Sequence, residues 1–311
     1  MTTLRIRHEA FLNHDTGEWH PERPDRMRAI DIALSEEKFQ NLHNVEAPVA
    51  TREQILRAHP QRYYEQLEKK RPKEDFITLD GGDTIMSPGS WDAALRGAGA
   101  AIFAVDEVMQ GRAKNAFCQV RPPGHHAETQ RANGFCLFNN VAIAAFHAKA
   151  IHGAERVAVV DFDVHHGNGT QEIFWSHPSL FYASTHQMPL FPGTGSVSER
   201  GASGNIVNAP LRAGDGGEQF REAFESVIFP ALERHAPDLI IVSAGFDAHR
   251  ADPLANINLV EEDFAWVTRK LIGVARERCG GRLVSSLEGG YDLVALGRSA
   301  AVHVQTLLEA M

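Results

Sequence analysis

The sequence contains little cysteine and no long apolar run. Its three cysteines are Cys118, Cys136 and Cys279, and no two of them show Cys-x-x-Cys spacing. This excludes a disulfide-stapled framework and a thiolate zinc finger. No stretch approaches the roughly 20 uncharged apolar residues that span a bilayer, and charged residues interrupt the N-terminus at once. We therefore expect a cytoplasmic protein with no membrane role.

Basic residues are also scarce relative to acidic ones. Lys and Arg number 31 against 40 Asp and Glu, which gives a formal charge of -9 at pH 7. This balance disfavours nucleic acid as a partner, because phosphate binding requires a basic surface, and it suits a cationic substrate. The hydrophobic content of 43% excludes disorder as the main state. Because there is no internal repeat or linker, we predict a single domain over residues 1–311.

Apolar runs alternate with helical patterns along the chain. Continuous Val, Ile and Leu runs are typical of parallel strands covered on both faces. The alternation predicts an α/β fold with a mostly parallel sheet flanked by helices on both faces, and ligands in such folds bind beyond the carboxyl ends of the strands. The expected strands are 117–120, 157–164, 180–184, 239–243 and 283–287, and the expected helices are 91–109, with Ser90 as N-cap, 140–151, 218–235, 261–278 and 293–308.

Polar residues gather where the second and fourth of these strands end. Because strand side chains alternate between the two faces, we expect Asp161, Asp163 and His165 to project to one side. A hydrogen-bonded strand end explains such a trio as well as a metal site does. Asp247, alone, is more often a helix cap. Together with Asp163 and His165 it predicts an Asp-His-Asp metal site that leaves one position for water.

Two further strand ends carry reactive side chains. His125 and His126 lie in a loop stiffened by two prolines, where proton transfer is a better prediction than metal binding. Tyr291 follows two glycines after the last strand, and its hydroxyl could donate to a developing oxyanion, although a lone Tyr there is usually structural. The sequence favours neither of two roles for Phe135, which are lining a pocket and packing in the hydrophobic core.

Several motifs occur in order along the chain. They are His-Pro-Glu-Arg-Pro at 20–24, Arg-Pro-Pro-Gly-His-His-Ala at 121–127, Asp-Phe-Asp-Val-His-His-Gly-Asn-Gly at 161–169, Phe-Pro-Gly-Thr-Gly at 191–195, Asp247 before Asp252-Pro253, and Glu-Gly-Gly-Tyr at 288–291. Together these motifs resemble a known family, the zinc-dependent histone deacetylases and acetylpolyamine amidohydrolases. The similarity is strongest to the class II branch and its bacterial relatives, and it extends over nearly the whole chain.

The resemblance implies a fold of the arginase-deacetylase type and a role for each matching residue. Zn²⁺ would be held by the predicted Asp-His-Asp set, and Fe²⁺ or Co²⁺ could replace it because mixed oxygen and nitrogen ligation is less selective than thiolate ligation. His126 would be the main general base and acid, His125 its partner held by Asp161, and Tyr291 would polarise the substrate carbonyl. The implied substrate channel comprises Gly134, Phe135, Phe191 and Leu254, and the implied structural K⁺ site comprises Asp161, Asp163, His165, Ser184 and Thr185.

The implied activity is hydrolysis of an acyl-lysine-like amide, in a peptide or a small acetylated amine. Tyr291 favours an active enzyme, since relatives with His at this place are poor deacetylases. Leu254 stands where polyamine-selective relatives can carry Glu, which argues weakly against acetylpolyamines. Asn168 replaces an Asp of class I relatives, which implies a different tuning of His126. The alternatives are hydrolysis of acetylpolyamines or other small amides, a ureohydrolase of the arginase type, and a non-catalytic zinc-containing module that binds acyl groups.

Overall fold

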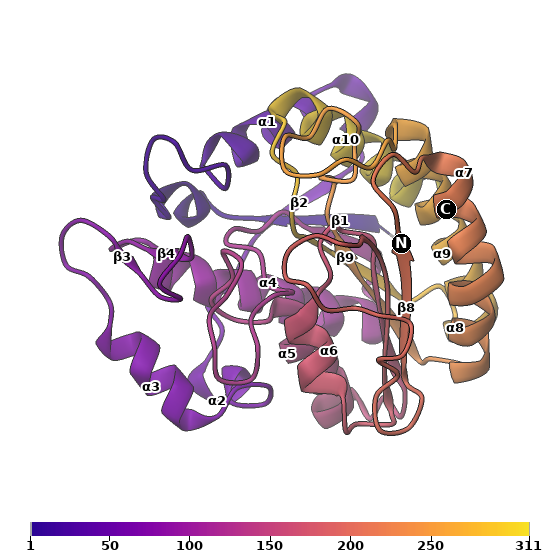
Figure 1. The fold of residues 1–311 in the computed structure, drawn as a ribbon, viewed down its shortest axis with the longest axis horizontal. Helices are drawn as coiled ribbons and strands as arrows, with labels where there is room; N and C mark the ends of the chain where they lie inside the picture. Colours follow the sequence, from indigo (N-terminus) through magenta and orange to yellow (C-terminus); the bar gives the residue numbers. More distant parts are fainter. Residues whose placement is uncertain (1, 311) are drawn as a thin grey trace.

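The structure, a computed structural model, describes residues 2–310 and consists of one α/β domain around a single large sheet (Figure 1). The predicted domain limits, Met1 and Met311, lie outside the described residues. Eight strands pair in the order β2-β1-β5-β10-β9-β6-β7-β8, and every pair is parallel. Their bounds are β1 Thr2–Arg7, β2 His43–Glu46, β5 Ala113–Cys118, β6 Val157–Asp161, β7 Leu180–Gln187, β8 Ile206–Leu211, β9 Leu239–Ala244 and β10 Leu283–Leu287, and a separate hairpin consists of β3 Ile77–Thr78 and β4 Ile85–Met86.

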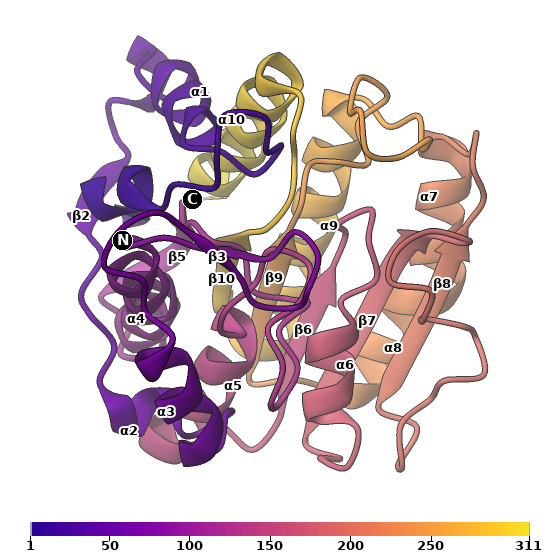
Figure 2. The same ribbon diagram turned by 60° about the vertical axis from the view of Figure 1, so that its left-hand side comes forward.

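Helices cover both faces of the sheet, as predicted (Figure 2). Helices α4, α5 and α6 pack on one face, and α8, α9 and α10 pack on the other, where α1 lies against α10. Their bounds are α1 Asp25–Ala33, α2 Arg52–Ile55, α3 Gln61–Lys69, α4 Ser90–Met109, α5 Asn140–His152, α6 Asn168–Phe174, α7 Gly217–Ala223, α8 Phe229–His235, α9 Glu261–Cys279 and α10 Leu293–Glu309, with short 3-10 segments at Glu9–Asn13 and Glu37–Phe39. Within residues 2–310, no helix is both long and apolar enough to cross a membrane.

Several predicted element boundaries need correction. Ser90 is not the N-cap of α4 but its first residue, and its hydroxyl accepts a hydrogen bond from the N–H of Ser87 at 2.7 Å. The helix predicted over 218–235 contains a π-helical turn, Phe224–Ile228, that separates α7 from α8. The first predicted strand begins at Ala113 and not at residue 117. The prediction missed this start because Lys114 and Asn115 interrupt the apolar run on which it relied.

The sheet includes strands that the apolar pattern did not reveal. Strand β1 carries Arg5, whose guanidinium is buried because it donates to Gln119 and pairs with Asp31. Strand β8 contains Asn208, whose buried amide donates to Gln171 at 2.7 Å. Polar residues satisfied by distant partners therefore hide these strands from a pattern based on hydrophobicity.

The carboxyl ends of the central strands form the edge where the reactive residues gather. Strand β6 ends at Asp161, so the predicted continuation of the strand to residue 164 is wrong. Asp163 and His165 lie on an irregular turn that leads into α6, and chain turning, not strand alternation, sets their direction. The turn is held by the Asp161 carboxylate, which accepts the N–H of Asp163 at 3.0 Å.

Candidate active site

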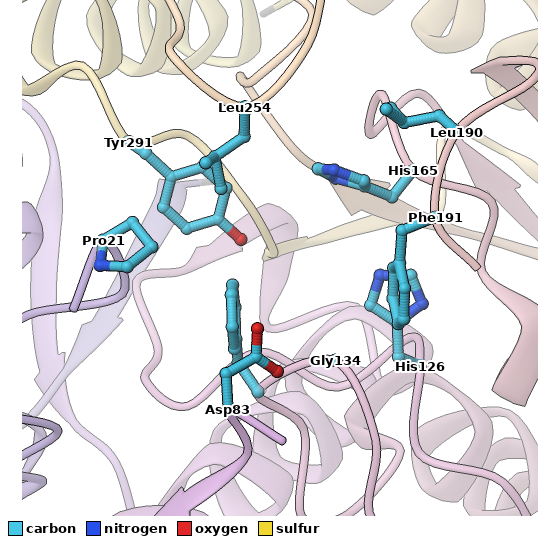
Figure 3. A pocket seen from close by; sticks show the side chains of 10 residues that line it. Pro21, Asp83, His126, Gly134, His165, Leu190, Phe191, Leu254 and Tyr291 are labelled. Atoms are coloured by element: carbon cyan, nitrogen blue, oxygen red, sulfur yellow. The ribbon is translucent and has the colours of Figure 1, made fainter.

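A narrow cavity of about 280 Å³ opens at this edge of the sheet (Figure 3). All four predicted channel residues line it. The Tyr291 hydroxyl and the His165 imidazole point toward the same space, and the Phe191 ring lies in front of His126. The full lining is Pro21, Asp83, His126, Gly134, Phe135, His165, Leu190, Phe191, Leu254 and Tyr291.

Two buried carboxylates, Asp163 and Asp247, converge on His165, which lines this cavity. The Nδ1 atom of His165 lies 3.2 Å from Asp163 Oδ1 and 3.0 Å from Asp247 Oδ2. One donor atom from each residue lies within 4.8 Å of the other two, which is a spacing that one metal ion can bridge. Glycines make room for the carboxylates, since a Cβ at Gly245 would lie 2.0 Å from Asp163 Oδ2 and one at Gly289 would lie 2.1 Å from Asp247 Oδ2.

The electrostatics of this cluster favour a positive charge among the three residues. Burial and the nearby Asp163 carboxylate raise the pKa of Asp247 to about 7. Burial lowers the pKa of His165, but hydrogen bonds to Asp163 and Asp247 outweigh it and raise that pKa to about 10. Two buried carboxylates need a neutralising cation, and a divalent ion bound to all three residues provides one.

His125 is held by a carboxylate at the end of β6. Its Nδ1 atom donates to Asp161 Oδ2 at 2.9 Å, and Asp161 also accepts a hydrogen bond from the hydroxyl of Tyr182 at 3.0 Å. Burial lowers the pKa of His125, but Asp163 and Asp161 more than compensate and raise it to about 10. His125 is therefore the cationic member of the histidine pair at neutral pH.

His126 has the opposite electrostatic character. Its ring centroid lies 4.0 Å from that of His125. Burial, followed by the charges of His125 and His165, holds the pKa of His126 well below its usual value. Asn168 Oδ1 lies 2.8 Å from His126 Nδ1, and Asn168 Nδ2 donates to Glu128 Oε1, so the amide orientation places the proton on Nδ1. The neutral ring therefore presents Nε2 as a proton acceptor.

Tyr291 is held by a hydrogen bond at its backbone and by a cation that packs on its ring. Its N–H donates to Asp252 Oδ2 at 2.7 Å, and the guanidinium of Arg26 lies 5.0 Å from its ring centroid. Burial raises the pKa of Tyr291 well above its usual value, so the hydroxyl keeps its proton and remains a hydrogen-bond donor. The Phe135 ring packs edge-on at 5.9 Å and completes this side of the cavity.

Comparison with known proteins identifies the family. The model of the histone deacetylase domain matches residues 20–307. The chain belongs to the histone deacetylase family. As a member of this family it is a hydrolase that acts on amide bonds.

Individual relatives of this histone deacetylase family member cover most of its length. It is 42% identical over 306 residues to an uncharacterised Synechocystis protein, slr0245, covering 96% of this chain and 97% of the relative. It is 41% identical to a histone deacetylase-like amidohydrolase of Pseudomonas aeruginosa, covering 88% of this chain and 73% of that one. The crystal structure of the HDA15 HD domain superposes with a TM-score of 0.93 at 36% identity, covering 99% of this chain and 89% of that one. The predicted fold type is therefore confirmed.

Sequence reasoning assigned no role to several buried residues that support the site. Glu288 Oε2 accepts the N–H groups of Gly124 at 2.6 Å and His125 at 3.1 Å, which fixes the histidine loop against β10. Glu22 pairs with both Arg26 and Arg121, and all three side chains are fully buried. The signal that could have identified Glu288 is a charged residue directly after an apolar strand. The only signal for Glu22 is its position in the His-Pro-Glu-Arg-Pro motif.

Three of the pocket residues were also missed. Asp83, Pro21 and Leu190 come from loops whose polar or proline-rich sequences do not indicate where they fold. Asp83 is exposed at the mouth of the cavity, and Figure 3 shows its carboxylate directed toward the cavity space. No local pattern in the sequence distinguished it from other surface acids.

A second cluster of potential ligands lies away from the cavity. Asp106 on α4 accepts hydrogen bonds from Nε2 of His147 at 2.7 Å and of His152 at 2.6 Å. Arg57 donates to Nδ1 of His147, which places the His147 proton on the Nε2 atom that faces Asp106. This tautomer suits a hydrogen-bonded clasp between α4 and α5.

Proposed function

We propose that the protein is a zinc-dependent deacetylase that removes acetyl or other acyl groups from lysine side chains. The observation that carries the proposal is that His126, Tyr291 and His165 line one largely apolar cavity, and that His165 belongs to the Asp163–His165–Asp247 cluster. An amide needs help at its carbonyl, at the attacking water and at the leaving amine, and these groups can supply all three.

Zn²⁺ would be held by Asp163, His165 and Asp247. Two carboxylates and one imidazole, without thiolates, leave a coordination position for water, which is typical of catalytic sites. When bound, zinc polarises the amide carbonyl and makes water easier to deprotonate. Mixed oxygen and nitrogen donors also accept Fe²⁺ or Co²⁺, so we name zinc as the first candidate and these ions as substitutes.

The two histidines have different roles in the reaction. His126 Nε2 takes a proton from the attacking water and returns it to the leaving amine nitrogen. His125, held as a cation by Asp161, stabilises negative charge that develops beside it. The Asp161–His125 hydrogen bond keeps this ring oriented while His126 exchanges its proton.

Tyr291 supplies the remaining hydrogen bond. Its neutral hydroxyl donates to the carbonyl oxygen as negative charge develops there. Because Asp252 holds the Tyr291 backbone and Arg26 packs on the ring, the hydroxyl is positioned before the substrate arrives. Such preorganisation avoids a reorganisation cost during the reaction.

The cavity wall fits an extended aliphatic chain. Phe135, Phe191 and Leu254 border it, and Gly134 leaves room beside His126, where a Cβ would lie 2.4 Å from the imidazole. Leu254 provides an apolar contact where a carboxylate would favour a second amine, so an acyl-lysine fits better than an acetylpolyamine. We also propose that Asp161, Asp163, His165, Ser184 and Thr185 surround a structural K⁺, because Ser184 pairs with Asp161 across β6 and β7.

The other candidates fit less well. An arginase-type ureohydrolase needs a second metal with more ligands, but His166, the residue after the metal histidine, bonds to Thr194 Oγ1 and Gln171 Oε1. A non-catalytic acyl-binding module has no use for a buried proton acceptor such as His126 beside a hydroxyl donor. The buried, unpaired cysteines suit a reducing compartment, and we propose the cytoplasm.

A turnover screen tests the proposed function. Acyl-lysine peptides and acetylpolyamines are incubated with the enzyme, with and without a chelator. We expect chelator-sensitive release of acetate from the peptides at a higher kcat/KM than from acetylpolyamines. Hydrolysis that continues unchanged after complete removal of metal contradicts the proposal.

A further inference from the structure

Trp19 exposes an indole to solvent close to the mouth of the cavity. At 94%, it is the most exposed of the large apolar side chains in residues 2–310. The N–H of His20 donates to the carbonyl of Gly17 at 3.3 Å, so Trp19 occupies the third position of a turn and projects from its tip. A single exposed apolar residue is ordinary, and its significance depends on its place.

The next residues in the chain connect Trp19 to the cavity. The His20 ring packs edge-on against the channel residue Phe135 at a centroid distance of 4.7 Å. His20 Nδ1 accepts the N–H of Glu22, so its Nε2 donates to the carbonyl of Asp83 at 2.9 Å. Pro21 itself lines the cavity. The indole therefore stands two residues from the cavity wall.

The turn that carries the indole is fixed at both ends. The N–H of Asp15 donates to Ser87 Oγ at 2.9 Å, and the Asp15 carboxylate accepts the N–H of Gly17 at 2.9 Å. The hydroxyl of Thr16 donates to the carbonyl of Glu22. A ligand that binds Trp19 thus meets an ordered backbone, which reduces the entropy cost of binding.

Other side chains beside the turn define the chemistry of this surface, which we call the Trp19 rim and which comprises Glu18, Trp19, Phe76 and Asp83. A Cβ at Gly17 would lie 3.9 Å from the ring of Phe76, which is itself 52% exposed. Glu18 and Asp83 are exposed carboxylates. Aromatic faces next to carboxylates attract an organic cation, and Arg stacks well on indole.

We propose that the Trp19 rim is a subsite for an Arg or Lys side chain that lies within two residues of the acyl-lysine in a polypeptide substrate. The inference rests on the proposed function and adds to it a preference for basic sequence context. A small acetylated amine has no second residue to reach the rim, so its binding does not involve Trp19.

Steady-state kinetics of paired peptides test the subsite. Each of the four test peptides carries one Arg, placed at the first or second position before or after the acetyl-lysine. A matched control peptide for each has Gln in place of this Arg. We expect Trp19→Ala to raise KM for at least one Arg peptide about fivefold, with kcat unchanged and no change for its Gln partner. Trp19→Phe retains a ring and should raise KM less than about twofold. The matched control is Trp175→Ala, at the far end of α6 and 39% exposed, which should change neither constant.

The outcomes separate this inference from the proposed function. Equal KM values for wild type and Trp19→Ala with all four Arg peptides overturn the subsite, as does an equal rise for the Arg and Gln peptides. In both cases wild-type turnover leaves the deacetylase proposal standing. If the wild-type holoenzyme hydrolyses none of the peptides, the proposed function fails and the subsite fails with it.

Discussion

Asn168 Oδ1 lies 2.8 Å from Nδ1 of His126, so a neutral amide orients the proposed catalytic base. The other end of the amide donates to Glu128, which fixes its orientation. This arrangement leaves the imidazole without a charged partner on its Nδ1 side. Burial and neighbouring histidines then keep the ring neutral.

Replacing Asn168 with a carboxylate should change the pKa of His126. In Asn168→Asp combined with Glu128→Gln, the Gln amide can donate to the new Asp, and the Asp charge stabilises the His126 imidazolium. The pKa of His126 then rises, and the acid limb of the kcat–pH profile moves to higher pH. Glu128→Gln alone serves as the control. An acid limb at the same pH in the double variant and the control would contradict the role of His126 as base.

Loss of the Tyr291 hydroxyl should impair turnover without affecting the fold. Tyr291→Phe removes the proposed donor to the developing oxyanion, and kcat should fall roughly 10²–10³-fold. The backbone hydrogen bond to Asp252 remains, so circular dichroism and metal content should match wild type. The measurement is kcat on an acetyl-lysine peptide. A kcat within about twofold of wild type would falsify the assigned role.

Asp247 should be necessary for metal retention. Asp247→Ala removes one of the three proposed ligands, and the ion content per chain after gel filtration should drop well below that of wild type. Elemental analysis provides the count, and zinc-dependent thermal stabilisation provides a second readout. Asp106→Ala, in the second cluster, is the matched control and should retain the wild-type ion content. Equal zinc content in Asp247→Ala and wild type is the contrary result.

Glu22 should contribute strongly to stability. Its carboxylate lies 2.6 Å from Arg121 Nε and 3.0 Å from Arg26 Nη1, and Glu22→Gln leaves two buried cations without a countercharge. We expect a loss of about 3–5 kcal/mol in the free energy of unfolding by urea. Glu65→Gln breaks the exposed pair with Arg52 and should cost no more than about 1 kcal/mol. Similar losses in the two variants would refute the importance of the buried cluster.

Mild acid should destabilise the fold through His303. This buried ring bonds to Thr268 Oγ1 and Ser285 Oγ, and burial lowers its pKa to about 3. Between that value and an unfolded pKa of about 6.5, the unfolded chain binds the extra proton, so stability falls as pH decreases through this window. This histidine alone should remove about 2 kcal/mol between pH 7 and pH 5. In urea titrations His303→Gln should lose correspondingly less over that range, and an unchanged pH slope would count against the effect.

The sequence predicted the central strands and the reactive motifs, but it did not predict strands β1 and β8 or the buried residues that support the site. Strands β6, β9 and β10 are buried on both faces, so most of their residues are apolar and the polar residues at their ends are conspicuous. Strands β1 and β8 contain polar residues such as Arg5 and Asn208, which are satisfied only by partners distant in the chain. The direction of Asp163 was expected from strand alternation, but the strand ends at Asp161 and a turn sets it instead.

The sequence by itself determined the α/β alternation and the chemical types available at each strand end, because periodicity and motif order are local properties of the chain. Only the tertiary structure decided which of these groups share a cavity and what charge each carries. Protonation depends on burial and on neighbours from other segments, as the opposite pKa shifts of the adjacent His125 and His126 demonstrate. The position of Trp19 beside the cavity likewise follows from contacts of its loop with Phe135 and Asp83, which lie far away in the sequence.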